Sequence, residues 1–176
     1  MFSRVNSMGL FGVDSYMVGV EVDCGQGLPR IDIVGLPDAS VSESRNRVRS
    51  AIKNNGYSFP QSRITVNLSP ADIRKEGPVY DLPIFIALLT ASGQLSTDIS
   101  ETAFIGELSL SGELRPVRGT LCMCVAARNA GIKEFYAPAD NAKEAAAVEG
   151  ITVYSVKNAS EIVKHLNGEH RLAPVE

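Results

Sequence analysis

Hydrophobic and polar positions alternate in two early segments of the chain. The alternation runs through Met17–Cys24 and again through Leu28–Val34, with Gly25-Gln26-Gly27 between them. A period of two is typical of a half-buried strand, and a short glycine-rich connection between two such strands predicts a hairpin. An earlier strand is predicted over Ser3–Leu10.

The pattern changes to a helical one after Gly35-Leu36-Pro37. Asp38 is the predicted N-cap of a helix that ends near Asn54, because a carboxylate there accepts the free N–H groups of the first turn. The predicted buried stripe consists of Val41, Val48, Ala51 and Ile52. Arg45, Arg49 and Lys53 follow one another at a spacing of four and form a cationic stripe on another face.

Residues 64–94 predict a strand, a polar loop and a strongly apolar helix. The strand covers Ile64–Leu68, and the helix begins near Asp81. We expect Asp81 to cap this helix, where its carboxylate would compete with any bound anion. The loop is therefore not expected to work as a catalytic loop. The residues expected to set its shape are Pro70, Asp72, Gly77, Pro78 and Asp81.

The second half alternates short strands and helices. Strands are predicted over 103–110, 113–117, 134–137 and 151–156, and helices over 119–130, 141–148 and 160–166. Strands followed by alternating helices and strands indicate an α/β or α+β two-layer domain.

Composition narrows the class of protein. The chain has 176 residues, 44% of them hydrophobic, and a net charge of −3, so no global field draws it to nucleic acid or acidic lipid. The longest apolar run, 82–91, is too short to span a bilayer, so no membrane partner is expected. Three cysteines without a C-x-x-C pair favour a reducing, cytoplasmic setting.

Several common sites are missing from the sequence. Neither a Walker A loop nor G-x-G-x-x-G occurs, and no motif offers metal ligands, so we expect no cofactor and no metal in this chain. The two histidines, His165 and His170, are expected to face solvent. Cys122 and Cys124, two positions apart on a predicted helix, are expected to point to different faces.

Two segments carry a family resemblance. The first, residues 31–89, contains VGLP, RVRSAI, NLSPAD, KEG and YDLP in this order, and the second, residues 105–141, begins IGELSLSGELRPVRG. Both resemble the N-terminal, Lon-protease-like domain of the ComM/YifB family of magnesium-chelatase-like AAA+ ATPases. The resemblance implies a ribosomal protein S5 domain 2-like fold in its Lon-like extended form, with a mixed sheet and helices mainly on one face. It also implies that residues 1–167 form this domain and that residues 168–176 are a linker toward a C-terminal ATPase module.

Comparison with Lon gives a sharp expectation about catalysis. The motif of the Lon nucleophile, D-G-P-S, is similar to Glu76-Gly77-Pro78-Val79, and the motif of its lysine, G-G-L-K, is similar to 118–121. Val79 and Leu121 thus occupy the dyad positions, and neither side chain supplies a hydroxyl or an amine. A peptidase is not expected. A small-molecule kinase of the same superfold is not expected either, because Pro78-Val79-Tyr80-Asp81 lacks the glycines and serines of a phosphate loop.

The resemblance implies a role as a non-catalytic domain of an ATP-driven ring motor, in the context of DNA branch migration and natural transformation. The alternatives are an accessory domain of a metal-insertion ATPase of the magnesium-chelatase type and a stand-alone Lon-like peptidase. ATP and Mg²⁺ are expected in the ATPase module, and the expected partners are that module, neighbouring subunits of a hexameric ring and DNA. Residues 45–75 contain seven cations and one acid, Asp72. This surplus predicts contact with DNA phosphates or a neighbouring subunit, or else a solvated face. The candidate contact residues are Arg45, Arg49, Lys53, Arg74 and Lys75.

Overall fold

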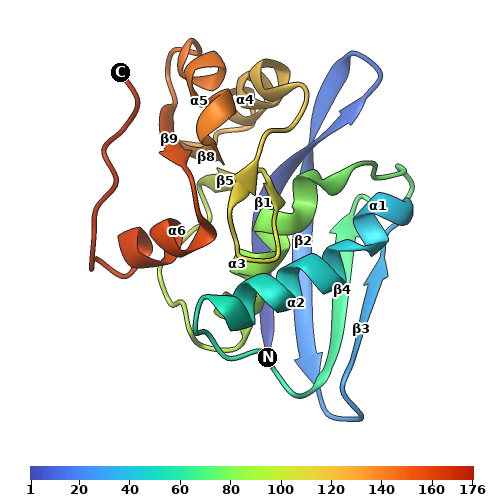
Figure 1. The fold of residues 1–176 in the computed structure, drawn as a ribbon. Helices are drawn as coiled ribbons and strands as arrows, with labels where there is room; N and C mark the ends of the chain where they lie inside the picture. Colours follow the sequence, from blue (N-terminus) through green and yellow to red (C-terminus); the bar gives the residue numbers. More distant parts are fainter.

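One mixed sheet organises the computed structural model, which describes all residues from Met1 to Glu176. Seven strands pair in the order β3-β4-β2-β1-β5-β8-β9, and β6 and β7 form a separate two-stranded ribbon (Figure 1). The strands are β1 Phe2–Phe11, β2 Asp14–Gly25, β3 Arg30–Val34, β4 Arg63–Ser69, β5 Thr102–Phe104, β6 Glu107–Leu108, β7 Leu114–Arg115, β8 Glu134–Pro138 and β9 Thr152–Val156. The helices are α1 Ala39–Ser42, α2 Ser44–Asn54, the 3₁₀ turn η1 Pro78–Tyr80, α3 Asp81–Ala91, α4 Thr120–Asn129, α5 Ala139–Ala146 and α6 Ala159–Leu166.

The predicted pairing of the second and third strands is wrong. β2 forms its hairpin with β1, in a register that places Phe11 opposite Asp14, whereas β3 pairs in parallel with β4. β4 lies between β2 and β3, antiparallel to β2. Alternation identified the strands, but it carried no information on which strand inserts between two sequence neighbours.

The apolar helix α3 lies at the centre of the domain. Every residue of α3 except Thr90 is buried, because the helix packs against β1, β2 and α2. A helix that is apolar all round is typical of a core element rather than a surface one. Ser3 of β1 donates its hydroxyl to the Ala87 carbonyl at 2.6 Å, which satisfies a buried polar group at this interface.

The segment after β3 forms two helices rather than one. Asp38 caps α1 as predicted, since its Oδ1 accepts from the Val41 N–H at 2.8 Å. The helix is interrupted at Glu43, and α2 begins at Ser44. Its buried face contains Val48, Ala51 and Ile52, as expected. The predicted strand 103–110 is likewise divided, into β5 and β6. Between them the Gly106 N–H donates to the Val79 carbonyl at 3.0 Å instead of to a neighbouring strand.

The C-terminal residues lie along the outer side of β9. Pro174 forms a bridge with Tyr154, and the Val175 N–H donates to the Val153 carbonyl at 2.8 Å. His165 is half-buried against the rings of Tyr136 and Tyr154, so the expectation that it faces solvent is wrong. Its Nδ1 accepts from the Leu172 N–H at 2.8 Å, and burial lowers its pKa below the usual value. That residues 168–176 lead to a further module stays a prediction.

The α/β class and the mixed sheet are confirmed. Relation to the S5 domain 2-like fold stays an expectation from the resemblance. The structure has no helix long and apolar enough to cross a bilayer.

Candidate functional site: a pocket and a cationic helix

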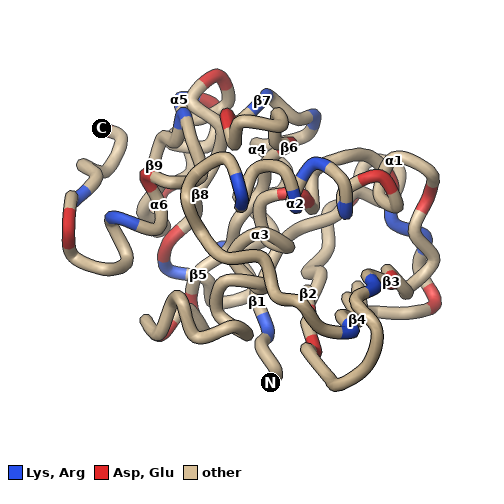
Figure 2. The backbone as a smooth tube through the Cα atoms, turned by 60° about the horizontal axis from the view of Figure 1, so that its bottom comes forward, with Lys and Arg blue, Asp and Glu red and all other residues tan.

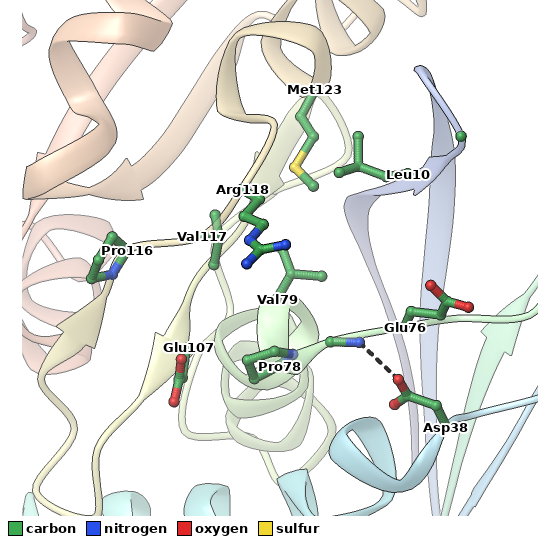
Figure 3. A pocket seen from close by; sticks show the side chains of 12 residues that line it. Leu10, Asp38, Glu76, Pro78, Val79, Glu107, Pro116, Val117, Arg118 and Met123 are labelled. Atoms are coloured by element: carbon green, nitrogen blue, oxygen red, sulfur yellow. Dashed lines mark hydrogen bonds between the residues drawn. The ribbon is translucent and has the colours of Figure 1, made fainter.

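A pocket of about 710 Å³ lies where the tip of the β1–β2 hairpin, η1, β6 and the start of α4 meet. Figure 3 shows Val79, Arg118 and Met123 converging on it from three different segments. Its walls combine apolar side chains with three carboxylates and one guanidinium. The lining residues are Leu10, Gly12, Asp38, Glu76, Gly77, Pro78, Val79, Glu107, Pro116, Val117, Arg118 and Met123.

Of the two dyad positions, one lines this pocket and the other does not. Val79 is 6% exposed and forms part of the wall, whereas Leu121 is 41% exposed and lies outside the lining. From the chain around that position, Pro116, Val117, Arg118 and Met123 line the pocket together with Val79. No serine, threonine, cysteine, lysine or histidine belongs to the lining, so the pocket contains no residue of the kinds that form a Ser–Lys dyad.

The loop between β4 and η1 is shaped largely by the residues predicted for that role. Gly77 has φ +79°, a conformation that favours glycine, and its N–H donates to Asp38 Oδ2 at 3.2 Å. Pro78 is the first residue of η1, where the missing N–H costs nothing. The Pro70 carbonyl accepts from the Lys75 ammonium. Asp72 is exposed and its carboxylate accepts no hydrogen bond, so nothing in the structure gives it the expected part in shaping the loop.

Asp81 does not cap α3. It is the first residue of the helix and is fully buried, with its carboxylate turned toward α2 and β6. Arg47 donates Nε to Oδ2 at 2.6 Å and Nη2 to Oδ1 at 3.1 Å, the Leu108 N–H donates at 3.0 Å, and the Ser44 hydroxyl also donates. Burial raises the pKa of Asp81, and these hydrogen bonds oppose that rise. The carboxylate therefore joins α2, α3 and β6, and it does not close off a helix N-terminus.

Lys75 is buried rather than exposed. Its side chain is 0% exposed, and its ammonium donates to the Gly35 carbonyl at 2.9 Å and to the Pro70 carbonyl. Burial lowers its pKa. The expectation that Lys75 contributes to a binding surface is wrong, because the ammonium fixes the loop to the turn after β3. Arg74 keeps an exposed side chain, 69% accessible, with only a long contact of 4.0 Å to Glu76.

The cationic stripe of α2 is present as predicted. Arg45, Arg49 and Lys53 are all exposed, and no carboxylate lies within 4.0 Å of any of them. Figure 2 shows the lysine and arginine positions along this helix. The Arg49 guanidinium lies over the Phe59 ring at 5.5 Å, which holds it in place while leaving it exposed. The spacing of four places successive cations about 6 Å apart along the helix axis.

Sequence reasoning did not assign the role of Arg47. It counted this residue among the surface cations, yet its side chain is only 18% exposed and pairs with Asp81. One signal was available, since Arg47 lies three residues after Ser44 and four before Ala51, both buried, and such spacings share one side of a helix. The partner, 34 residues away, could not be read from local spacing.

Comparison with known proteins gives the family. A family model described as subunit ChlI of Mg-chelatase matches residues 20–141. The chain belongs to this ChlI family. A protein named YifB from Escherichia coli strain K12 is 42% identical over 97% of this chain, and competence protein ComM from Haemophilus influenzae is 40% identical over 96%. A Lon protease from Brevibacillus choshinensis is 24% identical over 88% of the chain.

The family match covers both motif segments and all residues that line the pocket except Leu10 and Gly12. The chain spans about a third of the length of YifB (34%) and ComM (33%) and 21% of the Lon protease. The resemblance to the ComM/YifB family is thus confirmed. No group of three or more His, Cys, Asp or Glu residues lies close enough together to hold a metal ion.

Proposed function

We propose that this domain is a non-catalytic accessory module of a magnesium-chelatase-like AAA+ ATPase of the ComM/YifB type, and that the exposed face of α2 contacts the phosphate backbone of DNA. The observation that carries the proposal is the unpaired stripe of Arg45, Arg49 and Lys53. Helix α2 contains no acidic residue of its own. Its exposed face therefore forms a local positive field on a chain whose net charge is −3.

The electrostatics of the stripe suit a polyanion. Each of the three side chains is free to bind a phosphate, since none must first leave an acidic partner. The backbone beneath them is rigid, because Arg47 anchors α2 to Asp81 and Asn54 donates its amide to the Leu110 carbonyl at 2.8 Å. Contacts of this kind position a duplex and increase affinity without reading base sequence.

The non-catalytic part of the proposal rests on the pocket. Val79 stands where the resemblance to Lon expects a serine, and the residues around it carry carboxylates, one guanidinium and apolar groups. No side chain in that lining supplies the hydroxyl or the amine that a Ser–Lys dyad needs. We assign ATP hydrolysis, with its Mg²⁺, to the ATPase module expected in the full-length protein. Ring assembly, DNA branch migration and a role in transformation belong to the same proposal.

A second candidate role is contact with a neighbouring subunit or with the ATPase module. The tip of the β1–β2 hairpin favours it, because Phe11 is 67% exposed and Val13 is 90% exposed beside the pocket. Exposed apolar side chains that are clustered on a projecting tip are typical of a protein contact.

The DNA proposal is tested with two triple variants that carry the same change in charge. Arg45→Gln, Arg49→Gln and Lys53→Gln together should weaken binding of a fluorescent duplex at least tenfold at low salt. Lys143→Gln, Lys157→Gln and Lys164→Gln, which are also exposed but lie outside α2, should leave the affinity within about twofold. Equal losses of DNA affinity in both variants would show that binding depends on total charge rather than on α2, and would contradict the proposal.

A further inference from the structure

The two edges of the seven-stranded sheet differ in what covers them. The β9 edge carries residues of the C-terminal segment, which bond to Val153 and bridge Tyr154. The β3 edge has no strand beyond it, and Figure 1 places β3 at the outer side of the sheet. A free strand edge presents unpaired N–H and C=O groups to any extended partner.

The backbone of β3 divides into two sets. The Arg30 N–H donates to the Ser62 carbonyl, so Arg30 and, by the alternation of a parallel ladder, Asp32 and Val34 turn their backbone groups toward β4. Ile31 and Ile33 therefore turn theirs outward. The side chains of Arg30 and Asp32 share one face of the sheet, where Arg30 Nε lies 2.9 Å from Asp32 Oδ1.

We propose that this edge pairs with the same edge of a second copy of the chain, antiparallel and two-fold symmetric, with Ile31 opposite Ile31. In that register the two Ile31 residues exchange both backbone hydrogen bonds, because both turn their groups outward. Arg30 of each copy then stands directly opposite Asp32 of the other. These are non-hydrogen-bonded positions, where side chains approach most closely, so the contact forms two charge-complementary pairs.

Charge also selects this register against its neighbour. Moving the two-fold axis to Asp32 leaves every side chain on its face of the sheet and still pairs the outward-turned backbone groups. It places the two Asp32 carboxylates directly opposite each other, however. Like charges directly opposite are destabilising. A pairing shifted by one residue fails for another reason. It places residues whose backbone groups turn toward β4 opposite residues whose groups turn outward, so these hydrogen bonds cannot form.

Apolar side chains at the ends of the strand fit the same register. Val34, 45% exposed, comes opposite Leu28, 87% exposed, when the pairing extends beyond β3. Pro29 limits the extension, because it has no N–H to donate. The contact is short, so the dimer is expected to be weak and to depend on concentration.

The test uses two charge-reversed variants, Asp32→Arg and Arg30→Asp, in sedimentation equilibrium over a range of concentrations. Each variant alone opposes like charges at both pairs and should raise the dimer dissociation constant about tenfold or more. An equimolar mixture of the two opposes arginine and aspartate at both pairs and should return the constant to within about threefold of the unchanged chain. Both variants have lost the contact between Arg30 and Asp32 within one strand, so only pairing between chains can produce this recovery.

Cysteine cross-linking checks the register without relying on charge. In a chain with Cys24→Ser and Cys122→Ser, Arg30→Cys mixed with Asp32→Cys should give a disulfide-linked dimer under mild oxidation, because the two Cα atoms lie about 4.5 Å apart in a non-hydrogen-bonded pair. Arg30→Cys alone should cross-link far more slowly. A chain that stays monomeric at every concentration, a mixture no more dimeric than its components, or equal cross-linking with Arg30→Cys alone would overturn the proposal.

Discussion

The cation of the loop before η1 and the cations of α2 look alike in sequence but have opposite environments. Lys75 is 0% exposed and donates to two carbonyl groups of its own domain. Arg45, Arg49 and Lys53 are exposed and have no acidic partner. A positive charge in a polar loop is therefore weak evidence of a binding surface, whereas a repeated charge on one face of an anchored helix is stronger evidence.

Two acidic residues, Asp81 and Glu76, differ in the same way, one being buried and bonded and the other exposed. Asp81 is fully buried and holds α2 against α3 through Arg47. Glu76, at the rim of the pocket, is exposed and has only a 4.0 Å contact with Arg74. The two buried charges, Asp81 and Lys75, fix the positions of elements, whereas Glu76 and the α2 cations have weak or no ionic partners within the domain. The variants below test that division, from the largest expected effect on stability to the smallest.

Removing one member of the buried pair should have the largest effect. Arg47→Ala leaves the Asp81 carboxylate buried without its cation and should lower the free energy of unfolding by about 3–5 kcal/mol. Urea denaturation measures it. Arg45→Ala on the same helix is the matched control and should stay within about 0.5 kcal/mol. Equal losses in the two variants would show that the pair does not hold α2.

Lys75→Met should have the next largest effect. It removes the donor to the Gly35 and Pro70 carbonyls and should cost about 1–3 kcal/mol in the same denaturation experiment. DNA affinity should not change, since the ammonium does not reach the surface. Arg74→Met, at an exposed position in the same loop, serves as the control and should change stability little. A loss of DNA affinity in Lys75→Met without a loss of stability would contradict the buried role.

Neutralising the stripe of α2 should affect stability less. The triple variant Arg45→Gln, Arg49→Gln, Lys53→Gln should lose about 1 kcal/mol, mostly from the contact between Arg49 and Phe59. Its circular dichroism spectrum should match that of the unchanged chain. A cooperative loss of several kcal/mol would mean that these cations support the fold rather than a partner.

Restoring the two Lon-like side chains should produce no activity. Val79→Ser with Leu121→Lys places a hydroxyl in the pocket wall, but the new amine stays outside it, because position 121 does not line the pocket. Casein digestion followed by gel electrophoresis should show no cleavage above the unchanged chain. Any turnover that depends on both substitutions would show that the two positions do meet.

Sequence patterns identified most strands and helices of this fold, because alternation and helical spacing are local properties. They did not identify the insertion of β4 between β2 and β3, nor the break at Gly106, which depends on a bond to the distant Val79 carbonyl. In the site, the exposed α2 stripe was correctly placed, and Gly77 and Pro78 were correctly assigned to loop shape. The roles of Asp81 and Lys75 were misjudged, because each is bonded to residues 34 to 40 positions away.

The most direct test of the α2 proposal is the salt dependence of DNA binding. The slope of log affinity against log salt concentration is measured for the unchanged chain and for the triple glutamine variant on the same duplex. If Arg45, Arg49 and Lys53 each neutralise one phosphate, the slope should become shallower by about 3. An identical slope in the two proteins would show that α2 does not contact the DNA backbone and would contradict the account.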